Sequence, residues 1–107
     1  MKVVKINKFN GGWFIGNFKP SVLNTDLFEV CIKYHPKDQK WPAHYHKVAT
    51  EYNYLISGKM KIQNKTLKKG DIFILYPNEI ADPVFLEDCE VLVVKTPSII
   101  GDKYNIK

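Results

Sequence analysis

The sequence predicts an all-β barrel or sandwich, and three observations support this. Short runs rich in β-branched and aromatic residues recur along the whole chain, at intervals of about ten residues. Turn-forming residues separate these runs, and no window keeps a helical apolar period for three turns. The chain has 107 residues, 45% of them hydrophobic, which is enough for one core. We therefore expect a single domain over residues 1–107.

The runs predict the positions of the strands in order. Residues 3–6 and 13–18 come first, and we expect residues 1–24 to extend one sheet of the domain. In residues 27–34 an apolar face alternates with a more polar face, as in a strand with one buried side, and parity alone does not say which face points inward. The later strands are expected at residues 44–48, 52–56, 60–62, 72–76, 84–86 and 91–94.

The charge pattern argues against a nucleic-acid partner. The net charge is +5, and all 16 basic residues are lysines. Nucleic-acid readers rely on arginine for bidentate contacts to bases and phosphates. Because the lysines are scattered along the chain, we interpret most of them as solvated surface, with a weak preference for anionic small molecules through long-range steering.

The sequence also predicts a cytoplasmic protein with no membrane partner. No apolar run approaches the ~20 residues that a spanning helix needs, and the N-terminus lacks the apolar stretch of a signal peptide. Cys31 and Cys89 are too few for a disulfide framework, and both lie in apolar runs. We expect them to be small buried hydrophobes rather than catalytic thiols.

One stretch, HYHKVATEYNYLISG at residues 44–58, carries the chemistry. Residues two apart share a face on a strand, so His44 and His46 are expected to lie side by side. Residues 47–50 can form a tight reversal, after which Glu51 opens the next strand. Two imidazoles and one carboxylate then form a facial set that suits Fe, Mn, Ni or Zn.

The same stretch resembles the first motif of the cupin superfamily, G-x5-H-x-H-x3-4-E-x6-G. His44, His46, Glu51 and Gly58 match it at the family spacing, while Asp38 stands in place of the leading glycine. The resemblance covers about residues 25–96. It implies a double-stranded β-helix, or jelly-roll barrel, in a small single-domain protein that is commonly a homodimer.

The second cupin motif, G-x5-P-x-G-x2-H-x3-N, is matched loosely. Gly70 and Pro77 are recognisable with one extra residue between them, and Glu79 replaces the second glycine. Asp82 stands where the resemblance places a third histidine ligand, and Leu86 replaces the asparagine.

Asp82 has two interpretations. As a ligand it completes a set of two histidines and two carboxylates, which favours Mn²⁺ or Fe²⁺. Alternatively it is a turn residue before Pro83, and the site binds an ion weakly or not at all. Alternation of Asp82 with Val84 and Leu86 predicts that all three face the pocket.

Other candidates are weaker. Asn53 lies two residues beyond Glu51 and is expected on the same side, where it would contact a ligand or fix the glutamate. His35 precedes a proline and is expected at the surface. Trp41 is a candidate for the pocket rim, although Trp13 and Trp41 also fit a core or dimer interface.

The leading functional hypothesis is a metal-dependent enzyme acting on a small polar or anionic molecule inside the barrel. The resemblance leaves the reaction open between O₂-dependent oxidation and proton transfer, as in an oxygenase, isomerase or lyase. One alternative is a binding module for a sugar or carboxylate, without turnover. Another is a metal-free isomerase or epimerase like those acting on nucleotide sugars, with a motif histidine as general base and Asp82 orienting it.

Overall fold

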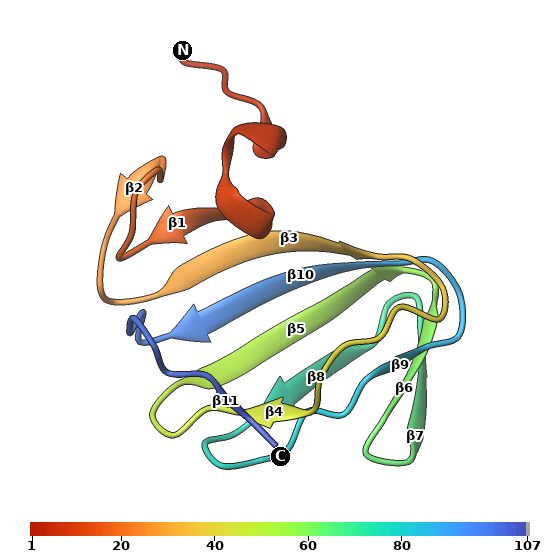
Figure 1. Cartoon of the computed structure of the whole chain (residues 1–107). Coiled ribbons are helices and arrows are strands. Elements are labelled where there is room, and N and C mark those ends of the chain that lie inside the picture. The colour runs from red at the N-terminus through yellow and green to blue at the C-terminus, as the bar shows by residue number, and fades with distance from the viewer. Residues whose placement is uncertain (107) are drawn as a thin grey trace.

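The computed structural model describes residues 1–106 as strands joined by turns and short loops (Figure 1). The strands are β1 (Trp13–Gly16), β2 (Leu23–Asn24), β3 (Glu29–His35), β4 (His44–Tyr45), β5 (Thr50–Ser57), β6 (Lys59–Ile62), β7 (Lys65–Lys68), β8 (Ile72–Leu75), β9 (Val84–Phe85), β10 (Cys89–Thr96) and β11 (Tyr104–Asn105).

Three sheets enclose the interior. The large sheet has the order β2-β1-β3-β10-β5-β8, and all its neighbours are antiparallel except β1 and β2. The small sheets β7-β6-β9 and β11-β4 lie away from it, at the right and the lower front of Figure 1. Neighbouring strands of the large sheet, such as β3 and β10, are therefore far apart in sequence.

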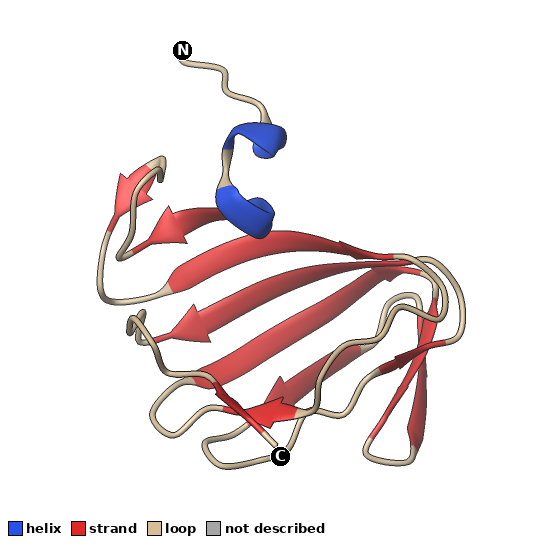
Figure 2. Cartoon of the chain, viewed as in Figure 1, coloured by secondary structure: helices blue, strands red, loops and turns tan. Residues whose placement is uncertain are grey.

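The all-β prediction is confirmed (Figure 2). The helical elements within residues 1–106 are two 3₁₀ turns, η1 (Ile6–Lys8) and η2 (Asn10–Gly12). No helix in this range is long and apolar enough to cross a membrane. The strand expected at residues 3–6 is wrong: Val3 is 72% exposed and no neighbouring strand supplies a ladder, so the β-branched run alone does not form a strand.

Three observed strands were not expected from the sequence. β2 and β11 have two residues each, too few for a recognisable alternation. β7 reads KTLK, and its polar composition resembles that of a turn. It forms because the turn at Gln63 and Asn64, both with positive φ, folds the chain back so that Lys65 pairs with Ile62.

The polar face of β3 points inward. Glu29, Cys31 and His35 are buried, whereas Val30 and Ile32 lie on the outer side of the sheet and are only partly buried. The alternation was predicted correctly, and the structure decides its direction. A polar inner face places charged and titratable groups inside the barrel.

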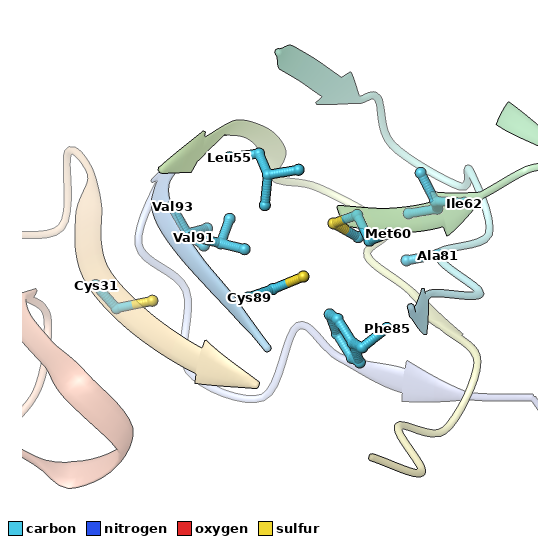
Figure 3. Packing of buried hydrophobic residues seen from close by; sticks show 9 residues of the cluster. All are labelled: Cys31, Leu55, Met60, Ile62, Ala81, Phe85, Cys89, Val91 and Val93. Atoms are coloured by element: carbon cyan, nitrogen blue, oxygen red, sulfur yellow. The ribbon is translucent and has the colours of Figure 1, made fainter. Parts of the chain in front are cut away.

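Buried apolar residues from β3, β5, β6, β9 and β10, together with Ala81, form one core cluster inside the barrel (Figure 3). Both cysteines belong to it and both are free, and burial raises the pKa of Cys31 to about 12. Such a thiol stays protonated and unreactive at neutral pH, as expected. The cluster consists of Cys31, Leu55, Met60, Ile62, Ala81, Phe85, Cys89, Val91 and Val93.

Gly58, the last residue of the first motif, turns the chain from β5 into β6 at a φ of 92°, and a Cβ there would lie 2.2 Å from the Asp88 carbonyl oxygen. Gly70 has a similar φ of 97° but open space around it. Gly70→Ala is therefore expected to cost about 1–2 kcal/mol of stability, from φ alone. Gly58→Ala adds a backbone clash and should cost about 3 kcal/mol or more. Urea denaturation of both variants checks this, and equal losses would contradict it.

Candidate functional site

A pocket of about 410 Å³ opens between the large sheet and the two small sheets. Its walls come from β3, β5 and β10 on one side and from β4, β6 and β9 on the other. The C-terminal residues 98–103 also line it. Most of the wall is apolar, so each charged or polar side chain in it stands out as a group that a ligand can reach.

His44 and His46 are held by a short stretch of paired backbone. His44 exchanges two backbone hydrogen bonds with Ala81, of 3.0 and 2.7 Å, which fixes β4 against the second motif. Both rings are buried, and their centroids are 5.4 Å apart. The Pro42 carbonyl oxygen lies 3.0 Å from Nδ1 of His44, so this nitrogen donates and Nε2 keeps its lone pair.

His46 faces Glu51. The His46 Nε2 and Glu51 Oε2 atoms are 3.5 Å apart, and neither ring nitrogen of His46 has a hydrogen-bond partner within residues 1–106 although both are buried. Burial, followed by the positive charge of Lys95, lowers the pKa of His46 to about 4. Burial also raises the pKa of Glu51. His46 is therefore a neutral imidazole at pH 7, the form that binds a metal or accepts a proton.

The loop between His46 and Glu51 is fixed by Asp102 from the C-terminal segment. Its carboxylate accepts hydrogen bonds from the backbone amides of Lys47 (2.8 Å) and Ala49 (2.9 Å), and from that of Val48 as well. Burial acts to raise the pKa of Asp102, but these amides outweigh it and hold the pKa below its ordinary value. Nothing in the motif spacing pointed to this residue, because it lies more than 50 positions away in sequence.

The structure does not bring Asp82 to the other three predicted ligands. Asp82 is exposed, and its Oδ1 accepts a hydrogen bond from the Gln63 amide at 2.8 Å. Ala81, the preceding residue, lines the pocket beside His44. The motif spacing counted from Pro77 leads to Asp82, whereas the same spacing counted from Gly70 leads to Ala81.

The predicted register after Asp82 is wrong for the same reason. Val84 and Leu86 are exposed, whereas Pro83 and Phe85 line the pocket. A shift of one residue moves every side chain of a strand to the opposite face. The side chain that faces the pocket at this point is thus that of Ala81, which cannot bind a metal.

Asn53 lines the pocket with Glu51, as predicted, and is 3% exposed. Its Nδ2 donates to the Phe73 carbonyl oxygen over 3.4 Å, and its amide acts to lower the pKa of Glu51 against the larger effect of burial. The side chain is therefore fixed beside the glutamate. Trp13 and Trp41 both line the pocket as well, and both pack against the apolar core cluster.

His35 was expected at the surface, but it lines the pocket and is only 7% exposed. Its ring stacks on Phe85 with centroids 4.1 Å apart, and its Nδ1 lies 2.6 Å from the Gln39 amide oxygen. Nδ1 therefore donates, and Nε2 is left as an acceptor. The sequence did contain a sign of this position, because His35 shares the polar face of the strand with Glu29 and Lys33. The proline after it suggested a surface turn instead.

The pKa of His35 is lowered from 6.5, mainly by burial, against the hydrogen bond to Gln39. The unfolded chain thus binds a proton more readily, and stability from this site falls as the pH drops below about 6.5. The stability lost in His35→Phe, which keeps the stack on Phe85, should be smaller at pH 5 than at pH 7.5. Thermal unfolding at both pH values checks this, and a loss independent of pH would contradict it.

The donors fit a metal ion by their chemistry, though not by their present arrangement. No three His, Cys, Asp or Glu side chains within residues 1–106 are arranged to hold an ion as they stand. Within residues 1–106 the two ring nitrogens of His46 nevertheless lack the hydrogen-bond partner that buried polar groups require, and the His44 ring and the partly buried Glu51 carboxylate lie next to them. A cation between them supplies it, in a set of two histidines and one carboxylate.

No protein-family model matches the chain, and no curated protein matches its sequence. Solved structures match its fold. An uncharacterised conserved protein with a double-stranded β-helix domain from Klebsiella pneumoniae gives a TM-score of 0.71 at 20% identity, over 97% of this chain and 90% of that one. A cupin protein from Bacteroides fragilis gives 0.56 at 21% identity, over 67% of each chain.

An enzyme is also among the matches. The DMSP lyase DddQ from Ruegeria pomeroyi gives a TM-score of 0.65 at 15% identity, over 83% of this chain and 46% of that one. At these identities the likeness concerns the fold. The sheet order, the pocket between the sheets and these matches agree: the chain has the double-stranded β-helix, or jelly-roll, fold of the cupins.

Proposed function

We propose that this protein is a small metal-dependent enzyme that binds one divalent transition metal through His44, His46 and Glu51. The observation that carries the proposal is the neutral, buried His46, whose two ring nitrogens have no hydrogen-bond partner among residues 1–106 and which faces the partly buried Glu51 carboxylate at 3.5 Å. Binding an ion requires these side chains to rotate toward one another. The barrel mouth then admits a small polar molecule.

The identity of the metal is less restricted than the sequence suggested. The preference for Mn²⁺ or Fe²⁺ depended on Asp82 as a second carboxylate, and Asp82 lies outside the pocket. Two imidazoles and one carboxylate suit Fe, Mn, Ni and Zn.

Proton transfer is the reaction class that the pocket residues support best. A bound divalent ion would polarise a carbonyl or hydroxyl of the substrate. His35, with its pKa lowered and its Nδ1 committed to Gln39, holds Nε2 ready to accept a proton. Asn53 orients a polar group beside Glu51. The lyase named among the matching structures is consistent with such chemistry on this fold.

Calorimetric titration of metal-stripped protein with Mn²⁺, Ni²⁺ and Zn²⁺, and anaerobically with Fe²⁺, tests the proposal. One ion per chain and a raised melting temperature are expected, since a ligand that binds the folded state stabilises it. If none of the four ions produces heat or a thermal shift, the metal-dependent function is overturned.

One observation favours a second candidate, a metal-free pocket that binds a small ligand or moves a proton without an ion. Ala81 rather than Asp82 lines the pocket, so three of the four side chains predicted as metal ligands remain. In this case the neutral His35 or His46 acts as the base. Activity or ligand binding that persists after treatment with a chelator would favour it over the metal-dependent function.

The homodimer remains a prediction, and the outer face of the large sheet offers a surface for it. Apolar side chains pair there across four strands, since Leu92 lies opposite Ile32 and Tyr54, and Tyr54 lies opposite Ile72. Ile72 is 69% exposed. Light scattering after size exclusion is expected to give twice the mass of the chain, and Ile72→Lys should lower it to that of a monomer.

A further inference from the structure

Three lysines and two tryptophans gather at one end of the pocket. Lys33 on β3, Lys95 on β10 and Lys103 in the C-terminal segment all line it, together with Trp13 and Trp41. The ammonium of Lys33 lies 6.0 Å from the Trp13 ring centroid and 5.6 Å from that of Trp41. Lys95 lies 5.1 Å from Trp13, and Lys103 lies 5.0 Å from Trp41. Each indole therefore serves two ammonium groups, and we call these five residues the lysine–tryptophan cluster.

The positive charge of this cluster is only partly balanced. Lys95 pairs with Glu29 at 3.7 Å, and Glu29 also accepts a hydrogen bond from the Ser98 hydroxyl. Within residues 1–106, neither Lys33 nor Lys103 forms an ion pair. The indole faces offer modest compensation. Two ammonium groups thus line the pocket without an ion-pair partner among residues 1–106, and only the more distant Glu51 carboxylate acts on Lys103.

Gathering like charges in a pocket costs free energy, so the cluster is not explained by folding stability. Burial and then the charges of Lys33 and Lys95 lower the pKa of Lys103. The same charges reach the predicted metal donors, because Lys95 and Lys103 both act to lower the pKa of His46. A concave site lined by one sign of charge concentrates ligands of the opposite sign.

We propose that the lysine–tryptophan cluster binds a carboxylate of the molecule that enters the pocket. The occupant is a small organic acid, since the 410 Å³ pocket must hold both its carboxylate and its reacting group. Three ammonium donors match a carboxylate, whose two oxygens accept several charge-assisted hydrogen bonds. The C-terminal segment is then part of the specificity site, because it contributes Lys103 while Asp102 anchors it.

The acid would make a second contact, in which another of its oxygens reaches His44, His46 and Glu51. Only this second contact rests on the proposed function. The carboxylate contact itself needs no metal. The substrate class is therefore an acid with a hydroxyl or carbonyl group near its carboxylate.

Malonate and its neutral analogue malonamide provide the test, on metal-free protein by calorimetry or by chemical shifts of the amides. Malonate should bind more tightly than malonamide, and its affinity should fall with added salt. Lys33→Met and Lys103→Met are each expected to weaken malonate binding by roughly tenfold. Lys47→Met is the matched control, since Lys47 also lies over an aromatic ring, 4.3 Å from the Tyr104 centroid, but outside the pocket.

Equal binding of the two probes, or malonate binding by both pocket variants as tight as in the control, would overturn the carboxylate site. Thermal unfolding of each variant checks that it is folded. Failure of metal binding leaves this result untouched, and failure of malonate binding leaves the metal titration untouched, so the two proposals are tested separately.

Discussion

Replacing His46 by alanine is expected to weaken divalent metal binding by about 100-fold or more, because it removes a ligand itself rather than a supporting group. Both ring nitrogens of His46 are buried next to Glu51 and have no hydrogen-bond partner in the described part of the chain, residues 1–106. Calorimetric titration with Mn²⁺ or Ni²⁺ measures the change. Glu51→Gln should give a similar loss, since the amide carries no charge.

Asp82→Ala is the control, and it distinguishes the ligand set that the structure supports from the one that the sequence motif suggested. The exposed Asp82 carboxylate bonds the Gln63 amide outside the pocket, so its removal should leave metal affinity unchanged. A loss in Asp82→Ala comparable to that in His46→Ala would contradict this register and restore the ligand set suggested by the sequence.

Asp102→Ala is expected to lower the free energy of unfolding by about 2–4 kcal/mol. It leaves the amides of Lys47, Val48 and Ala49 without their shared acceptor, and hydrogen bonds to a charged group contribute about 1.5–3 kcal/mol each before the loop relaxes. For a domain of this size the melting temperature should fall by roughly 10–20 °C. Because the same loop joins His46 to Glu51, metal affinity should fall as well.

The control for Asp102 is again Asp82→Ala, which removes an acceptor of one amide and should cost about 1 kcal/mol. The dependence on pH has a definite sign. The pKa of Asp102 is below 3.8 in the folded protein, so its contribution is complete above that value and is lost as the pH falls through the lower folded pKa. Equal stability losses in the two variants at pH 7 would contradict the role of Asp102.

The sequence predicted the parts of the molecule that depend on local pattern. Alternation placed most strands, and the spacing of His44, His46 and Glu51 correctly brought them to one pocket. This works because the side-chain period of a strand is two residues, so a short motif on two successive strands joined by a tight turn fixes much of its own geometry. The turn residue Gly58 belongs to the same local pattern.

The parts that failed depend on pairing between distant segments. Asp82 was misplaced because one inserted residue shifts a strand face, and only the backbone pairing of His44 with Ala81 reveals the shift. Asp102 and Lys103 were not found because no motif marks a segment that returns to the pocket after the last long strand. His35 was hidden by the proline that follows it, although its position in β3 points it inward.

A crystal structure of the protein soaked with Mn²⁺, with anomalous scattering used to locate the ion, tests the central claim most directly. We expect one anomalous peak per chain inside the barrel, within about 2.0–2.3 Å of nitrogens of His44 and His46 and an oxygen of Glu51. A barrel without a peak at saturating Mn²⁺, or a peak bound by Asp82, would contradict the account.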